Sequence, residues 1–153
     1  MNFTDGIASV NDNQLRQRIQ HHLDDLTKPP GSLGRLEEIA MQYCLCKADT
    51  NAALKQMAVY TFAGDHGVTE ESITPYPREV TRQMVLNMAG GGAAASVMCR
   101  TAGTRYAVVD MGVDADFPDM PGIMSRKVMR GTKNFARDAA MTTAECEQAI
   151  QHG

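Results

Sequence analysis

The densest cluster of ionisable residues follows an apolar run and could carry acid–base chemistry or bind a metal. Residues 57–63 are strand-forming, and Gly64, Asp65, His66 and Gly67 come directly after them. Histidine and carboxylate groups at the end of a strand are common metal ligands and proton carriers, and the flanking glycines allow close backbone approach. Asp65 could instead only hydrogen-bond its own loop. We favour a substrate site for Asp65 and His66, without a metal.

Other groups near this cluster have simpler interpretations. Glu70 and Glu71 follow on what reads as an exposed loop, and we expect them to be solvated. The glycines at 90–92 could bind a phosphate through their backbone N–H groups. They follow a predicted helix instead of a strand and lack a Gly-Lys-Ser/Thr sequence, so a helix break is the better interpretation.

A basic segment and four cysteines complete the groups that could react or bind. Arg126, Lys127, Arg130 and Lys133 could meet an anionic substrate, but a solvated face is the simpler interpretation. The cysteines contain no Cys-x-x-Cys pair, which argues against zinc and favours thiols in a reducing compartment: Cys44, Cys46, Cys99 and Cys146.

A second kind of surface is apolar and aromatic. Pro75 and Pro77 fix the loop that carries Tyr76, and Met84 follows two helical turns later. A ring with a polar tip beside a flexible thioether suits a flat aromatic ligand. Ordinary packing of the loop on the core explains the same residues equally well.

The N-terminal periodicity predicts two helices. Asp12 and Asn13 can cap a helix over residues 14–26, and Ser32 can cap a second helix that ends near Cys46. On the second helix we expect the apolar residues to point inward: Leu33, Leu36, Ile39, Ala40 and Tyr43.

The remaining chain alternates strands and helices. Strands are predicted at 57–63 and 106–113, with helices at 78–88 and 93–100 between them, and a short edge strand at 125–129. Thr142 and Glu145 form a capping-box pattern for a last helix. The first strand is apolar on both faces, as in a buried parallel sheet. We predict an α/β fold: a partial Rossmann-like parallel sheet flanked by helices and preceded by a helical hairpin.

Charge and hydropathy restrict the partners. A net charge of −3 argues against nucleic acid or an anionic membrane as partner. No apolar stretch is long enough to cross a bilayer, and the N-terminus lacks the pattern of a signal peptide. We expect a cytoplasmic protein.

Five ordered blocks together resemble the nicotinate-nucleotide–dimethylbenzimidazole phosphoribosyltransferases. The blocks are LTKPPGSLGRLE at 26–37, FAGDHGV at 62–68, YPREVTRQMVLN at 76–87, VDMGVD at 109–114 and GTKNFA at 131–136. The resemblance implies transfer of phosphoribose from nicotinate mononucleotide to 5,6-dimethylbenzimidazole. The products are α-ribazole 5′-phosphate, which supplies the lower ligand of cobalamin, and nicotinate. It also implies a homodimer without a cofactor.

The resemblance assigns roles to some residues and leaves one role empty. Tyr76, Pro77 and Met84 fall where the family lines its benzimidazole pocket, and Asp65 and His66 fall at its mouth. Residues 1–50 correspond to part of a small helical domain, and 51–153 to the first part of the phosphoribosyltransferase domain.

The family's general base is a glutamate near its C-terminus, and it has no counterpart in this chain. Glu145 and Glu147 lie in the wrong block for that role. We therefore expect the N-terminal portion of such an enzyme, inactive alone and self-associated through uncovered apolar surface. The alternative is a non-catalytic module that binds an aromatic base or a nucleotide.

Overall fold

The computed structural model describes residues 5–153, which divide into two compact units, one ending at Lys55 and the other running from Gln56 to Gly153. The first unit contains α1 (Asn13–Asp25) and α2 (Arg35–Lys47). The second contains β1 (Ala58–Gly64), a 3-10 helix η1 (Gly67–Glu71), α3 (Glu79–Ala89), α4 (Ala94–Thr101), β2 (Arg105–Gly112), β3 (Ile123–Ser125) and α5 (Thr143–His152).

The first predicted helix is confirmed together with its cap. Asp12 precedes α1, and its carboxylate accepts a hydrogen bond of 2.8 Å from the backbone N–H of Leu15. Leu15, Ile19 and Leu23 form the buried face. Spacing and capping therefore suffice to define α1.

The start and the buried face of the second helix were wrongly predicted. Gly34 precedes α2 without a side-chain cap, so Ser32 is not its N-cap. The loop before it is closed by an ion pair of 2.9 Å between Lys28 and Glu37, whose carboxylate also accepts the N–H of Leu33. The helix begins at Arg35, after this closed loop.

Most residues of α2 that pack on α1 lie on a different face from the predicted one, although Ala40, which was predicted to point inward, does pack against this core. The side of α2 that contacts the α1 core carries Met41, Cys44 and Leu45. Leu33, Leu36 and Ile39 are exposed instead, and Ala40 and Tyr43 are half-buried. The helix is apolar on two sides, and α1 covers only one of them, so periodicity alone could not choose between them.

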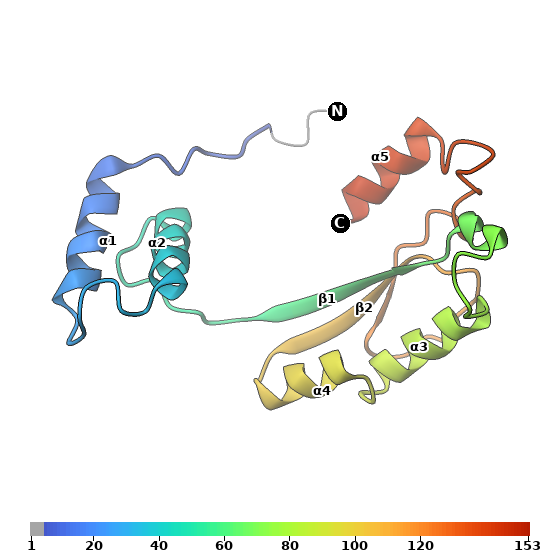
Figure 1. Cartoon of the computed structure of the whole chain (residues 1–153), viewed down its shortest axis with the longest axis horizontal. Helices are drawn as coiled ribbons and strands as arrows, with labels where there is room; N and C mark the ends of the chain where they lie inside the picture. The colour runs from blue at the N-terminus through green and yellow to red at the C-terminus, as the bar shows by residue number, and fades with distance from the viewer. Residues whose placement is uncertain (1–4) are drawn as a thin grey trace. The chain divides into compact units, whose positions relative to one another are not determined.

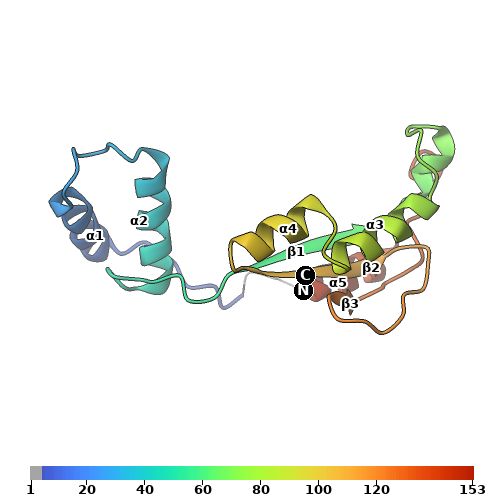
Figure 2. The same cartoon turned by 90° about the horizontal axis from the view of Figure 1, so that it is seen from below.

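The second unit is an α/β layer structure, as predicted. Its strands are parallel in the order β1-β2-β3, with β2 central. Helices α3 and α4 lie on one face of the sheet and α5 on the other (Figures 1 and 2). The core between α3 and the sheet is centred on Val85, Val108 and Val113.

Two strand predictions need correction. The third strand covers Ile123–Ser125 instead of 125–129, because Gly122, at φ +93°, ends the preceding turn and starts the strand earlier. β1 is parallel, but it is an edge strand among the described residues and is not buried on both faces. Phe62 is 54% exposed, and Tyr60 and Val59 are also open.

No helix within residues 5–153 combines the length and the apolar character that a bilayer span requires.

Candidate functional site

The carboxyl ends of β1 and β2 meet at one edge of the sheet, and the chemically active residues gather there. Gly64 pairs with Gly112 after a register shift, and Asp65 follows on the next position. The backbone N–H of Asp65 donates to the carbonyl of Gly112 at 3.0 Å. In open parallel sheets this edge is where ligands bind.

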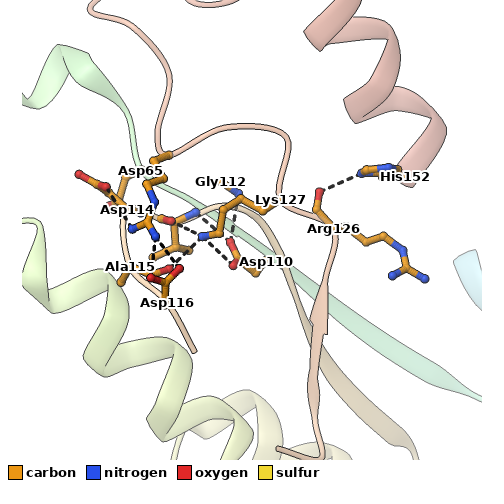
Figure 3. A network of polar contacts seen from close by, with 11 residues as sticks. Asp65, Asp110, Gly112, Asp114, Ala115, Asp116, Arg126, Lys127 and His152 are labelled. Carbon is orange, nitrogen blue, oxygen red and sulfur yellow. Dashed lines mark hydrogen bonds and ion pairs between the residues drawn. The ribbon is translucent and has the colours of Figure 1, made fainter. Parts of the chain in front are cut away.

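Asp65 is buried, and both oxygens of its carboxylate accept hydrogen bonds from the protein. It is 8% exposed. Oδ1 accepts from the hydroxyl of Thr81 on α3 at 2.7 Å. Oδ2 accepts from the backbone N–H of Asp114 at 2.8 Å, in the loop that follows β2 (Figure 3). The side chain therefore joins α3 to the end of β2.

His66 faces a different neighbour. Its Nδ1 lies 3.2 Å from the hydroxyl of Thr132, and the N–H of Gly67 donates to the carbonyl of Thr132 at 2.9 Å. A Cβ on Gly67 would lie 2.4 Å from the backbone nitrogen of Asn134, so only glycine allows this approach. Two of the sequence blocks, 62–68 and 131–136, are thus in direct backbone contact.

The side chains that could bind a metal do not group together in the part of the chain that the structure describes. Among the described residues, no three histidine, cysteine, aspartate or glutamate side chains are grouped to hold a metal ion. The four cysteines are all free thiols.

A small cavity lies beside Asp65 and His66. Its volume is about 130 Å³, and a cavity of about 150 Å³ accommodates one benzene molecule. The lining is mainly apolar and comes from the two strand ends, the following loops and α5: Gly64, Asp65, His66, Met111, Gly112, Val128, Met129, Gly131, Thr132, Met141 and Ala149.

Tyr76 and Met84 lie outside this cavity, on the surface of the segment that leads into α3 and on α3 itself. Tyr76 is 71% exposed and Met84 is 41% exposed. Pro77 is also exposed and accepts the N–H of Val80 in the turn before the helix. Tyr76, Met84 and Asp65 lie close together in sequence. In the structure, the hydrogen bond from the hydroxyl of Thr81 on α3 to Asp65 connects the two segments.

Glu70 and Glu71 are exposed as predicted, but they are not merely solvated. Glu71 accepts from the amide of Asn134 at 2.7 Å and pairs with Arg137 at 2.9 Å. The Asn134 hydrogen bond and the charge of Arg137 lower the pKa of Glu71 below its ordinary value. Glu70 lies 3.5 Å from both Arg78 and Arg137. These contacts hold η1 against the segment 131–138.

The interpretation of the basic segment as a solvated face is wrong for one of its residues, Lys127. Lys127 is largely buried and pairs with the buried carboxylate of Asp110 at 2.8 Å. Its ammonium also donates to the carbonyls of Ala115, at 2.9 Å, and Val113. Arg130 binds both carboxylate oxygens of Asp116, and this contact lowers the pKa of Asp116.

Two of the four basic residues are thus paired: Lys127 with Asp110 of β2, and Arg130 with Asp116 of the loop that follows β2. Arg126 and Lys133 are exposed, as a solvated face predicts. Sequence reasoning missed Asp110, Lys127, Thr81 and Thr132 as structural partners of the site. Asp110 had a visible signal, since a carboxylate within an apolar strand needs a partner when buried. The hydroxyls of Thr81 and Thr132 had none.

The triple glycine behaves as a helix break, as expected. Gly90 ends α3, and Gly91 has a φ of +84°, which a residue with a side chain rarely adopts.

Comparison with known proteins shows consistent similarities. A family model described as Phosphoribosyltransferase matches residues 8–153. The chain is 53% identical over 142 residues to the nicotinate-nucleotide–dimethylbenzimidazole phosphoribosyltransferase of Chlorobium chlorochromatii, covering 93% of this chain and 40% of that protein. It is 50% identical to the protein of the same name from Geobacter sulfurreducens, again over 93% of this chain and 40% of the relative.

The solved structures agree with the sequence comparison. The crystal structure of the Thermus thermophilus protein with that name superposes with a TM-score of 0.85 at 42% identity, covering 92% of this chain and 42% of that one. The resemblance inferred from the five blocks is confirmed. The chain spans about 40% of the length of the curated relatives that it matches.

Proposed function

The chain belongs to the phosphoribosyltransferase family, and on that premise we propose that it forms part of an enzyme that transfers phosphoribose from nicotinate mononucleotide to 5,6-dimethylbenzimidazole. The products are α-ribazole 5′-phosphate and nicotinate. Two observations carry the proposal: the match of residues 8–153 to the phosphoribosyltransferase family model, and the identity of 50–53% over 142 residues to relatives whose names give this activity.

Within this enzyme the chain contributes the wall that receives the accepting base. Tyr76 and Met84 offer a ring and a thioether on an open surface, and Pro77 shapes the loop between them. Such side chains suit the flat, mostly apolar face of a benzimidazole. His66 belongs to the same site at the end of β1, and the buried Asp65 lies next to it in the chain.

Glu145 does not supply the proton-accepting group of the reaction. The carboxylate of Glu145 accepts the N–H and the hydroxyl of Thr142 at 2.7 and 2.8 Å as the capping box of α5. A carboxylate used in this way is a helix cap, and the pKa of Glu145 is lowered by these bonds, which makes it a weaker base.

Further features of the proposal concern assembly and location. We propose residues up to about 50 as part of a small helical domain and 51–153 as part of the phosphoribosyltransferase domain, in a cytoplasmic homodimer without nucleic-acid or membrane partners. The free thiols and the exposed edge of β1 support the location and the association, respectively.

A turnover assay tests the catalytic part of the proposal. The purified chain is incubated with nicotinate mononucleotide and dimethylbenzimidazole, and α-ribazole 5′-phosphate is measured by chromatography. We expect no sustained product formation by this chain alone. Sustained turnover would refute the proposal that the general base is not among the residues of this chain.

Calorimetry with dimethylbenzimidazole tests the wall and the alternative function, a module that binds an aromatic base or a nucleotide without chemistry. Saturable binding that weakens about tenfold in Tyr76→Ala and in Met84→Ala supports the wall, as expected for the loss of one ring or thioether contact. Met98→Ala is the matched control, since Met98 is exposed on α4. Tight binding without turnover favours the module, whereas undetectable binding excludes it.

A further inference from the structure

The carboxylate of Asp65 is buried where a substrate-binding carboxylate would need to be open. Thr81 and the N–H of Asp114 occupy its two oxygens at 2.7 and 2.8 Å. Its own backbone N–H and carbonyl are bonded to Gly112 and Thr132. Every polar group of this residue is thus used to join neighbouring segments of the fold.

Asp65 joins α3 to the loop after β2. Thr81 lies on α3, between Tyr76 and Met84 in sequence. Asp114 lies in the loop after β2, whose position is itself fixed by the contacts of Lys127 with Asp110 and the carbonyls of Val113 and Ala115 (Figure 3). A continuous set of polar contacts therefore runs from Lys127 through this loop to α3.

We propose that Asp65 is a positioning residue: it holds α3 and the loop after β2 together by hydrogen bonds and makes no contact with substrate. This inference rests on the proposed function in one respect: the role of α3, which is to present Tyr76 and Met84 to the base. The role needs two hydrogen-bonding atoms at the end of the side chain and does not need a negative charge.

Asparagine meets the same requirement without the charge. Its carbonyl oxygen can accept the N–H of Asp114, and its NH₂ group can donate to the hydroxyl oxygen of Thr81, which rotates to accept. Asp65→Asn should therefore preserve the junction, whereas Asp65→Ala removes both bonds. Thr81→Ser keeps the hydroxyl and Thr81→Val removes it at almost constant volume, which provides a second matched pair.

The experiment measures amide hydrogen exchange by NMR in the whole 153-residue chain, followed by dimethylbenzimidazole affinity. The exchange of the Asp114 N–H and of the α3 amides reports the junction directly. Asp119→Asn, at an exposed carboxylate, controls for the loss of one charge.

In the Asp65→Asn and Thr81→Ser variants, we expect the Asp114 N–H and the α3 amides to exchange at the same rates as in the unmodified chain. In Asp65→Ala the Asp114 N–H should exchange at least about tenfold faster. The α3 amides should lose protection in both Asp65→Ala and Thr81→Val. Base affinity should follow the same order, retained within about twofold in Asp65→Asn and reduced about tenfold in Asp65→Ala, as for the loss of a charge-assisted hydrogen bond.

Two results would overturn the inference. One is unchanged exchange at Asp114 and α3 in Asp65→Ala. The other is preserved exchange in Asp65→Asn with base affinity reduced as much as in Asp65→Ala, because only a carboxylate in contact with the ligand behaves so. If the unmodified chain binds no base, the wall of the proposed function fails, and the exchange pattern alone decides the role of Asp65.

Discussion

Replacing Lys127 by methionine tests whether the buried ion pair holds the loop after β2. Methionine keeps most of the length of the side chain and removes the ammonium, which lies 2.8 Å from Asp110 Oδ2 and 2.9 Å from the carbonyl of Ala115. Removing one partner of a buried ion pair typically costs about 3–5 kcal/mol, because the other charge is left uncompensated.

The structure places the expected cost at the lower end of this range. Asp110 retains hydrogen bonds from the N–H groups of Gly112 and Val113, at 3.1 and 2.9 Å, which continue to stabilise its charge. The side chain of Lys127 is also 21% exposed, so water compensates part of the loss. We expect a decrease of about 3 kcal/mol in the free energy of unfolding.

Urea denaturation followed by tyrosine fluorescence measures this decrease. With an m-value of about 1.5 kcal/mol/M, the midpoint should fall by about 2 M. Lys133→Met is the control, since Lys133 is exposed in the same segment and its replacement should change stability by less than about 0.5 kcal/mol. The double variant Asp110→Asn/Lys127→Met should cost less than the sum of the two single changes. Equal effects of Lys127→Met and Lys133→Met, or strict additivity, would refute the reasoning.

Three other perturbations address the close approach after β1, the cap of α5 and the open edge of the sheet. Gly67→Ala should cost at least about 2 kcal/mol in urea denaturation, because its Cβ would meet three backbone atoms within 2.8 Å; Gly64→Ala, with no atom nearer than 3.9 Å, is the control and should cost less than half as much. Thr142→Ala should lower stability by about 1 kcal/mol. Because the backbone N–H of Thr142 lowers the pKa of Glu145, the stabilisation by Glu145 is complete at neutral pH. This stabilisation is lost as the pH falls through that lowered pKa. Circular dichroism measures the helix content against pH, and a helix content that does not change across this pH range would contradict the prediction. Phe62→Lys should reduce self-association in light scattering, because a charge on the exposed edge strand opposes pairing with another chain; a monodisperse unmodified monomer would contradict the expected association.

Much of the fold could be predicted because local chemistry decides it. The cap at Asp12, the capping box of Thr142 and Glu145, and the strand that ends at Gly112 depend on residues close in sequence. The third strand starts two residues and ends four residues earlier than predicted, and the positive φ of Gly122 sets its start. Such a turn conformation cannot be read from the glycine alone.

The buried face of α2 and the role of the basic segment could not be predicted, because both depend on distant partners. Leu36 and Met41 are equally apolar, and only the position of α1 decides which of them is covered. Lys127 reads as a surface residue until Asp110, 17 positions earlier in the chain, is brought next to its ammonium. Asp65 was singled out as a candidate substrate residue, and its partners Thr81 and Asp114 became visible only in space.

The exposure of Met84 has a consequence for oxidative chemistry. Thioethers are oxidised in the order in which peroxide reaches them, and the sulfoxide is polar and chiral where the thioether was apolar. Met84 and Met98 are open to solvent, while Met41 lies in the core of the first unit. An oxidant therefore reaches the surface proposed for the base before it reaches that core, and modifies recognition while the fold is still intact.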